Sequence, residues 1–327
     1  MKTADQQTNL QKGCFKLEPI VVGKPWGGDH LKDFQTKTCK LNVGEVVLLS
    51  ALADFPSKIE YNNESILFIN FWQNIAFPKL IANNSKYSNL EDFPFMLKLI
   101  STDEPLSIQV HPSNTDVKRL GLSGFGKAEA WFILESDSQA KAYFGLKVAS
   151  TYEEFLSSSD ENKLNFLTTL NPHKNNIYFL QPGLIHGTQG KLLFFEIQQS
   201  SNYTFRLYDF GRGRKLSLEQ AAKVVKLQAK TKATSYGAGV NIENFHLDIL
   251  GCEKLQVYEL NSDQAPFQIV SFFTNSGYIT GDNFHYDVKW GDSFFIWGLD
   301  FVKESISFKS TKSSQKNDFI VFASPNL

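Results

Sequence analysis

Polar side chains with ligand chemistry fall at strand-like spacing in the stretch 105–131, PLSIQVHPSNTDVKRLGLSGFGKAEAW. Its first part alternates apolar and polar residues, which predicts a strand with Gln109 and His111 on one face. Lys127 and Glu129 alternate in the same way in the next apolar segment. Imidazole nitrogen and carboxylate oxygen are ordinary ligands of divalent metals such as zinc, and an amide oxygen is a rarer one. A histidine alone is more often structural, but this pairing favours a metal site.

A further nitrogen donor comes from His186, which lies in a glycine-containing turn at 181–187. Glu196 follows in an apolar strand segment, and Arg206 follows Glu196 by ten residues. A metal held by two His, one Glu and one Gln leaves room for substrate oxygens, and it can polarise a carbonyl and stabilise an enediolate. Arginine stays charged and matches the geometry of phosphate or carboxylate. The alternative for Arg206 is a structural ion pair with Asp209 or Glu196.

The composition is that of a globular chain without a strong charge bias. The 327 residues are 42% hydrophobic with a formal net charge of -1, enough for two modest domains or one large β-rich domain. No basic stripe stands out, which argues against nucleic acid as a partner. Cys14, Cys39 and Cys252 are too few and too scattered for a disulfide framework, so we expect a reducing cytoplasm. We find neither a signal peptide nor an apolar run of about 18 residues that could span a membrane.

Many short strands separated by turn residues predict a mainly β protein of the barrel or sandwich class. The few helices fall between groups of strands, which argues against a doubly wound parallel sheet. We expect strands at 15–22, 41–52, 58–61, 93–100, 106–111, 131–134, 140–144, 177–180, 192–199 and 203–208, with the 131–134 and 140–144 strands paired. We expect helices at 65–71, 75–81, after a cap at Ser150, at 161–170 and at 217–229. Residues 1–12 read as a loose arm and 232–241 as a linker.

Two features allow more than one interpretation. Lys98 interrupts an apolar strand, and it is either an edge-facing lysine or part of a site. The sequence GLSGFGK at 121–127 is a lone glycine-rich turn, and it is a weak candidate for a phosphate loop because no strand–loop–helix context supports it.

Several segments in order resemble the type I mannose-6-phosphate isomerases, and the resemblance is closer to their short bacterial form. The segments are PLSIQVHP, GKAEAW, PGLIHGTQG and FFEIQQSSNYTFRLYDFGR, with WGG at 26–28 and FPFMLKLIS at 93–101. The resemblance covers about residues 15 to 230. The C-terminal part agrees only in length and strand-rich character. Two segments, GEVVLLS at 44–50 and WGDSFFIWG at 290–298, depart from the sequence pattern of the family, and neither contains an expected zinc ligand.

The resemblance implies a cupin-type (jelly-roll) β-sandwich with one zinc ion per chain, and an isomerase that interconverts mannose 6-phosphate and fructose 6-phosphate through a cis-enediolate. It implies a catalytic cupin domain with helical insertions at 1–235 and a C-terminal β-sandwich domain at 236–327. Carried over position by position, the zinc ligands would be Gln109, His111, Glu129 and His186. The catalytic residues would be Arg206, Glu196 and Lys127, and the substrate-binding residues Ser107, Lys98 and Arg212.

The general base stays open between Glu196, Lys127 and a water at the zinc, and the phosphate would be held by some of Arg206, Arg212, Lys127 and Ser107. Two other functions are possible. A metal-dependent cupin oxygenase would usually show a His-x-His or His-x-Asp/Glu pair, whereas this chain has Gln-x-His. A non-catalytic sugar-phosphate-binding cupin would be expected to have lost a ligand or the arginine. The expected partner is a small phosphosugar, and the oligomeric state is open between monomer and dimer.

Overall fold

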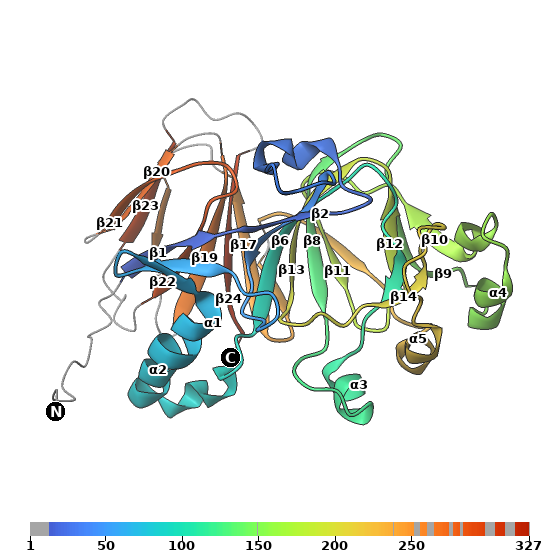
Figure 1. The fold of residues 1–327 in the computed structure, drawn as a ribbon, viewed down its shortest axis with the longest axis horizontal. Coiled ribbons are helices and arrows are strands. Elements are labelled where there is room, and N and C mark those ends of the chain that lie inside the picture. The colour runs from blue at the N-terminus through green and yellow to red at the C-terminus, as the bar shows by residue number, and fades with distance from the viewer. Residues whose placement is uncertain are drawn as a thin grey trace.

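The computed structural model describes residues 13–148, 150–237, 239–251, 256–259, 265–274, 277–281, 284–297, 305–310 and 318–326. The arm expected at 1–12, Cys252 and the last residue of the 290–298 segment lie outside these residues. Strands dominate the described part of the chain, which confirms the mainly β class, and they form four antiparallel sheets that follow one another along the molecule (Figure 1).

Two of the sheets enclose the predicted site. The seven-stranded sheet runs β15 (Lys232–Ser235), β11 (Asn176–Leu180), β8 (Glu129–Ser136), β13 (Leu192–Gln199), β6 (Phe95–Thr102), β3 (Val43–Leu49) and β2 (Ile20–Gly23). The five-stranded sheet runs β10 (Leu167–Leu170), β9 (Lys141–Leu146), β12 (His186–Gln189), β7 (Ile108–Val110) and β14 (Phe205–Tyr208).

The other two sheets contain most of the C-terminal strands. The eight-stranded sheet runs β16 (Val240–Ile242), β17 (Phe245–Gly251), β24 (Phe319–Pro325), β19 (Phe267–Phe273), β22 (Ser293–Trp297), β1 (Gly13–Glu18), β4 (Lys58–Tyr61) and β5 (Glu64–Leu67). The four-stranded sheet runs β18 (Gln256–Glu259), β23 (Ser305–Ser310), β20 (Gly277–Gly281) and β21 (Phe284–Val288).

The helices are short and connect the strands. They are α1 (Phe68–Phe71), α2 (Phe77–Asn83), α3 (Asn114–Arg119), α4 (Tyr152–Ser157) and α5 (Leu218–Val224). A π-helical turn at Trp72–Ala76 joins α1 to α2, and 3-10 turns lie at Asp29–Phe34, Ser85–Leu90 and Lys163–Phe166. None of the helices in the described residues is long and apolar enough to cross a membrane.

The seven-stranded sheet is a central layer with different chemistry on its two faces. One face packs on the eight-stranded sheet in the largest apolar core, where Phe195 of β13 contacts Phe273 of β19 with ring centroids 5.6 Å apart. The other face and the five-stranded sheet enclose a second cluster, where Trp131 lies 4.8 Å from Phe194 between ring centroids. Adjacent residues of β13 alternate between these two environments, so Glu196 faces the five-stranded sheet along with Phe194.

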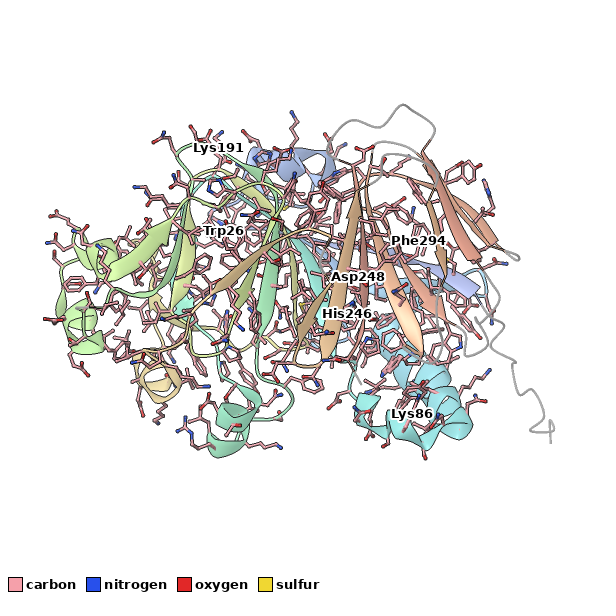
Figure 2. All side chains as sticks on the ribbon, turned by 180° about the vertical axis from the view of Figure 1, so that it is seen from behind. Trp26, Lys86, Lys191, His246, Asp248 and Phe294 are labelled. Carbon is pink, nitrogen blue, oxygen red and sulfur yellow. The ribbon has the colours of Figure 1, made fainter. Side chains whose placement is uncertain are left out.

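A third apolar cluster lies between the eight- and four-stranded sheets and contains Phe294 of β22, labelled in the view from behind (Figure 2). Burial of aromatic side chains in all these layers removes large apolar areas from water, which is the dominant favourable term in folding. The layered β architecture with few helices agrees with the expected cupin type.

Three expected helices are wrong in part. The segment 161–170 forms only a 3-10 turn at Lys163–Phe166, because Leu167–Leu170, with its two threonines, pairs with β9 as a strand. The segment 65–71 begins as β5, paired with β4, and its helix starts at Phe68. The helix expected to reach residue 229 ends at Val224.

The expected helix caps are shifted or incomplete. The capping box predicted from Ser150 begins one residue later: the Thr151 hydroxyl accepts from the Glu154 backbone N–H, and the Glu154 carboxylate accepts from the Thr151 backbone N–H. Ser217 precedes α5 as predicted, but its side chain makes no capping hydrogen bond.

Strand pairing is where the sequence-based expectations fail most. The segments 131–134 and 140–144 are strands but do not pair with each other, because β8 belongs to the seven-stranded sheet and β9 to the five-stranded sheet. The segment 15–22 is two strands in different sheets, and the expected linker 232–241 contributes β15 and β16. The domain division after residue 235 stays a prediction, although β1 and β4 share a sheet with strands beyond residue 240.

Candidate active site

A pocket of about 360 Å³ opens between the seven- and five-stranded sheets, within the usual range for small-ligand sites. Its lining is mixed in polarity and strongly charged. The lining residues that matter below are Lys24, Trp26, Glu45, Lys98, Ser107, Gln109, Lys127, Trp131, Glu196, Asn202, Thr204, Arg206 and Arg214. The predicted residues from distant parts of the sequence therefore meet in one place.

Two histidines beside the pocket have their ring orientation fixed by the backbone. His111 Nδ1 lies 2.7 Å from the Tyr203 carbonyl oxygen, and His186 Nδ1 lies 2.9 Å from the Leu184 carbonyl oxygen. A carbonyl can only accept, so each Nδ1 carries the proton and each Nε2 keeps a free lone pair. This arrangement is typical of metal-binding histidines, in which one ring nitrogen is oriented by a hydrogen bond and the other binds the ion.

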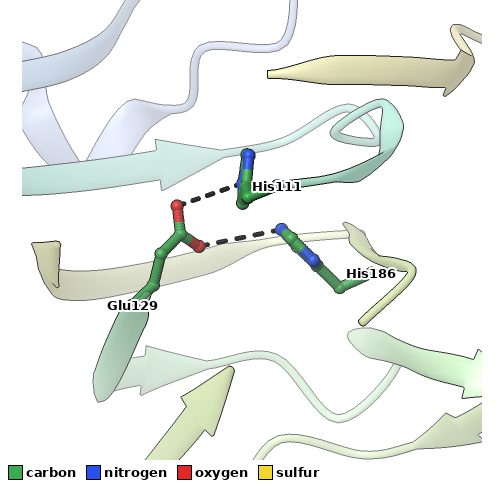
Figure 3. A group of neighbouring side chains, drawn as sticks. All are labelled: His111, Glu129 and His186. Carbon is green, nitrogen blue, oxygen red and sulfur yellow. Dashed lines mark ion pairs between the residues drawn. The ribbon is translucent and has the colours of Figure 1, made fainter. Parts of the chain in front are cut away.

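Glu129 faces both histidines, one with each carboxylate oxygen, as Figure 3 shows. Its Oε1 is 3.2 Å from His111 Nε2, and its Oε2 is 3.7 Å from His186 Nε2. One ligand atom from each residue lies within 4.8 Å of the others, and all three side chains are buried. Apart from the ion pair that Lys127 forms with Oε1, neither carboxylate oxygen of Glu129 accepts a hydrogen bond from the described residues. Oε2 of this buried carboxylate is left without a donor, which is costly, and a divalent cation would satisfy it, so the residues present fit a metal.

The protonation states suit metal binding. Burial, followed by the positive charge of Lys127, lowers the pKa of His111. Burial and the neighbouring His111 lower the pKa of His186 to about 3. Burial alone would raise the pKa of Glu129, but the charge of Lys127 and the contact with His111 hold it well below its usual value. The site therefore presents two neutral imidazoles and one ionised carboxylate, which are the forms that bind metal.

Gln109, the fourth predicted ligand, comes from β7, which lies between β12 and β14 in the five-stranded sheet. It is the cross-strand neighbour of His186 on one side and of Arg206 on the other. Its Nε2 lies 3.4 Å from His186 Nε2, and its Oε1 accepts from the Ser107 hydroxyl at 3.1 Å. The strand predicted from the alternation at 106–111 is shorter than expected, but it places these polar side chains on one face.

The seven-stranded sheet, which carries Glu129 at the start of β8, also contributes charged and aromatic side chains to the pocket. The Trp131 indole N–H donates to Glu196 at 2.9 Å, and Lys98 Nζ lies 3.6 Å from Glu196. Lys98 comes from β6, which lies between β13 and β3, so the interpretation as an edge-facing lysine is wrong. Burial and the charge of Glu129 raise the pKa of Glu196 to about 7, against the opposing effect of Lys98. The Lys127 ammonium pairs with Glu129 and lies 3.3 Å from His111 Nε2.

An arginine cluster flanks the pocket around one buried carboxylate, Asp209. Asp209 accepts from Arg212 and Arg214, and Arg206 Nε lies 3.9 Å from it. Three guanidinium groups around one carboxylate leave two positive charges at this end. The structural ion pair considered for Arg206 is thus formed with Asp209, while the same side chain also lines the pocket. Its buried Nε has no hydrogen-bond acceptor among the described residues.

The structure brings nine of the ten predicted site residues to the pocket or to the adjoining triad, and it places the tenth, Arg212, differently. Arg212 donates to the Pro105 and Asp209 carbonyls and to the Asp209 carboxylate, so its guanidinium holds the loop in place. The glycine-rich turn at 121–127 contributes only Lys127 to the pocket lining.

Sequence reasoning missed several lining residues. Lys24 and Glu45 form an ion pair of 3.1 Å at the pocket, and Arg214 lines it near Arg206. The alternation in the strand around Glu45 and the repeat GRGR that contains Arg214 were the available signals. Neither signal says which cavity a side chain enters.

The comparisons with known proteins agree with this geometry. Residues 14–127 match the family model described as "Phosphomannose isomerase type I, catalytic domain". A mannose-6-phosphate isomerase of Streptococcus mutans is 26% identical over 301 residues, which covers 86% of this chain and 91% of the relative. The crystal structure of the mannose 6-phosphate isomerase from Bacillus subtilis is similar with a TM-score of 0.72 and 20% identity, covering 95% of this chain and 99% of the other.

A crystal structure of a zinc-bound mannose 6-phosphate isomerase has a TM-score of 0.67 at 14% identity, covering 96% of this chain and all of the other. These structural likenesses establish the fold. The family model over residues 14–127 and the sequence relatives show in addition that the chain is similar to type I phosphomannose isomerases.

Proposed function

We propose that this protein is a zinc-dependent isomerase that interconverts mannose 6-phosphate and fructose 6-phosphate. The observation that carries the proposal is the buried His111–Glu129–His186 triad beside a pocket with an arginine cluster at one side. The names of the related proteins, which are mannose-6-phosphate isomerases, support the same reaction. One zinc ion per chain would be held by the triad and the Gln109 amide oxygen.

The phosphate group of the substrate would bind at the arginine end of the pocket. Arg206 and Arg214 both line the pocket, and the cluster carries two uncompensated positive charges. Guanidinium groups pair with phosphate oxygens in bidentate geometry, so two of them suit a phosphate dianion. Because Arg212 is engaged by backbone carbonyls and Asp209, the phosphate role expected for Arg212 passes to Arg214 in this proposal.

The reacting carbons would then lie near the metal-binding residues, because Arg206 neighbours Gln109, which in turn neighbours His186. A divalent ion bound there would supply Lewis-acid polarisation of the substrate carbonyl. Lys127 and Lys98 also line the pocket and would add positive charge where negative charge develops as the enediolate forms.

Proton transfer requires one group that removes the proton from C2 and returns it to C1. As the C2–H bond breaks, its electrons form the C1–C2 double bond and the π electrons of the C1 carbonyl move to O1. The ketose forms when the O2 proton moves to O1, the C2 carbonyl forms, and the electrons of the C1–C2 double bond take up the proton at C1. Glu196 is the favoured base, since burial brings its pKa to about 7, near the operating pH of a general base. The Trp131 indole N–H donates a hydrogen bond to Glu196 and orients its carboxylate.

A coupled assay of fructose 6-phosphate formation tests the proposal, run before chelation, after chelation and after zinc return. Activity that disappears and returns with zinc is the expected result. Folded, zinc-loaded protein without activity on mannose 6-phosphate would overturn it. We also propose that the protein acts in the cytoplasm, where the free thiols of Cys14 and Cys39 would stay reduced.

A further inference from the structure

The short segment that carries Lys127 and leads into Glu129 is fixed by three successive backbone N–H groups. Gly126 N donates to Asn114 Oδ1 at 2.8 Å, and Lys127 N donates to the Pro112 carbonyl at 2.9 Å. Ala128 N donates to the side-chain oxygen of Gln199 at 2.9 Å. Two of these three acceptors are side-chain amides, so the position of the segment depends on particular residues as well as on the strand ladder.

Gln199 is the centre of this arrangement and is buried, with 1% of its surface exposed. Its backbone N–H also donates to the Ala128 carbonyl at 3.0 Å, so main chain and side chain both hold Ala128. Its Nε2 donates to Asn114 Oδ1 at 3.2 Å and to Asn244 Oδ1 at 2.6 Å. All the hydrogen-bonding capacity of the amide nitrogen is therefore used, which fixes the orientation of the group.

Asn244 belongs to the turn between β16 and β17, in the eight-stranded sheet. The end of the described chain clamps this turn, because Asn326 N donates to the Asn244 carbonyl at 2.9 Å and Asn326 Nδ2 donates to the Glu243 carbonyl at 3.1 Å. A continuous series of hydrogen bonds thus connects the C-terminal strands to the backbone on both sides of Lys127.

We propose that Gln199 is a positioning residue that places Lys127 and Glu129, and that Asn244 makes this placement depend on the C-terminal strands. The backbone beside Lys127 has little room to move, because a Cβ added at the neighbouring Gly126 would lie 2.5 Å from the Ser113 backbone. The segment therefore packs directly against the turn that follows His111. This inference rests on the proposed function only for the identity of the ion and the reaction.

The test compares Asn244→Ala, Asn244→Asp and Gln199→Glu with a control, Ser271→Ala. Asn244→Asp keeps the oxygen that accepts from Gln199. Gln199→Glu keeps the acceptor for Ala128 but cannot donate to either asparagine. Ser271→Ala removes the buried hydrogen bond between the Ser271 and Ser293 hydroxyls in the eight-stranded sheet. It therefore reports the effect of a general loss of stability away from the pocket.

Three experiments are needed: amide hydrogen exchange of the peptide covering 126–129 in zinc-free protein, the zinc dissociation constant by chelator competition, and steady-state kinetics that give kcat and KM. We expect Asn244→Ala and Gln199→Glu to speed exchange beyond the control and to weaken zinc binding about tenfold, as loss of a ligand-orienting partner does. In these two variants we expect kcat to fall by a larger factor than KM changes. Asn244→Asp should keep the wild-type exchange rate, zinc affinity and kinetic constants.

Asn244→Ala protein whose exchange and zinc affinity equal those of Ser271→Ala would overturn the proposal, and Gln199→Glu answers the same question if Asn244→Ala does not fold. The exchange and zinc measurements need no substrate. A wild-type protein that binds zinc but does not isomerise mannose 6-phosphate would therefore refute the proposed function and leave this inference standing.

Discussion

Replacing Glu196 with glutamine should stabilise the zinc-free protein at neutral pH while it abolishes most activity. Glu196 is 4% exposed, and its pKa rises from 4.5 to about 7 on folding. Each pKa unit corresponds to about 1.4 kcal/mol, so the ionised carboxylate costs at most about 3 kcal/mol of folding free energy. Glutamine keeps an acceptor for the Trp131 indole and removes the charge. Loss of a general base should also lower kcat by about 10²- to 10⁴-fold.

The sign of the pH dependence follows from proton uptake. Between pH 4.5 and 7 the folded state binds a proton at Glu196 that the unfolded state has lost, so the wild-type protein loses stability as pH rises through this window. The variant lacks this titration. The free energy of unfolding of wild type minus that of the variant should therefore fall by up to about 3 kcal/mol from pH 4.5 to pH 8.

Denaturant unfolding of chelator-treated protein at several pH values measures this difference directly. Glu45→Gln is the matched control, because burial alone would raise the pKa of Glu45 but the charges of Lys98 and Lys24 lower it below 4.5. Its difference from wild type should change far less than that of Glu196→Gln between pH 5 and pH 8, because Glu45 is the weakest of the charges that shift the pKa of Glu196. An equally small change for Glu196→Gln would refute the raised pKa assigned to Glu196.

Four other substitutions have defined outcomes. Glu129→Gln should lower zinc content, measured by elemental analysis, by 10-fold or more, since it removes the one anionic ligand of the triad; zinc retained at full occupancy would contradict the site. Arg214→Ala should raise KM for mannose 6-phosphate by about 10-fold or more, as expected for loss of a charge-assisted hydrogen bond of about 1.5–3 kcal/mol. Arg212→Ala should mainly lower thermal stability. The reverse result would return the phosphate role to Arg212. His246, seen with Asp248 on β17 in Figure 2, has its pKa raised by the hydrogen bond to Asp248. The ion pair with Asp248 should stabilise the fold below about pH 6.5 and lose that effect as pH rises through the raised pKa of His246. His246→Gln should remove this small pH dependence from thermal melts. An unchanged pH dependence would argue against this role of the ion pair.

The chemistry of the site could be predicted from the sequence because strand periodicity fixes which side chains share a face. Gln109 with His111, and Lys127 with Glu129, needed only the period of two. The mainly β class followed from the same local signals. These inferences use contacts within one segment, which the order of residues determines directly.

Sheet partnership could not be predicted in the same way. Gln109 lies beside both His186 and Arg206 only because β7 pairs with β12 and β14, and no local pattern states this. Strands β8 and β9 follow one another in the sequence, which predicts that they pair, but they belong to different sheets. The choice depends on the total apolar area that each layer can bury, which is a property of the whole chain.

The roles of Arg212 and Arg214 show a finer limit. Both are arginines in one glycine-rich turn, and Gly211 and Gly213 have positive φ values of 72° and 74°. Those backbone angles turn one guanidinium toward the Pro105 carbonyl and leave the other at the pocket. Side-chain direction at such a turn depends on dihedral angles that residue type alone leaves open.

The two-faced central sheet also restricts how this protein can change during evolution. Phe195 and Glu196 are adjacent, yet one fills the largest core and the other faces the pocket. Inserting or deleting one residue within β13 would exchange the two sets, burying the carboxylate in the core and pointing the ring at the substrate. Strands β6 and β8 have the same constraint. Variation in length should therefore accumulate in the turns between strands, and new specificity in this scaffold should arise by substitution along the pocket face.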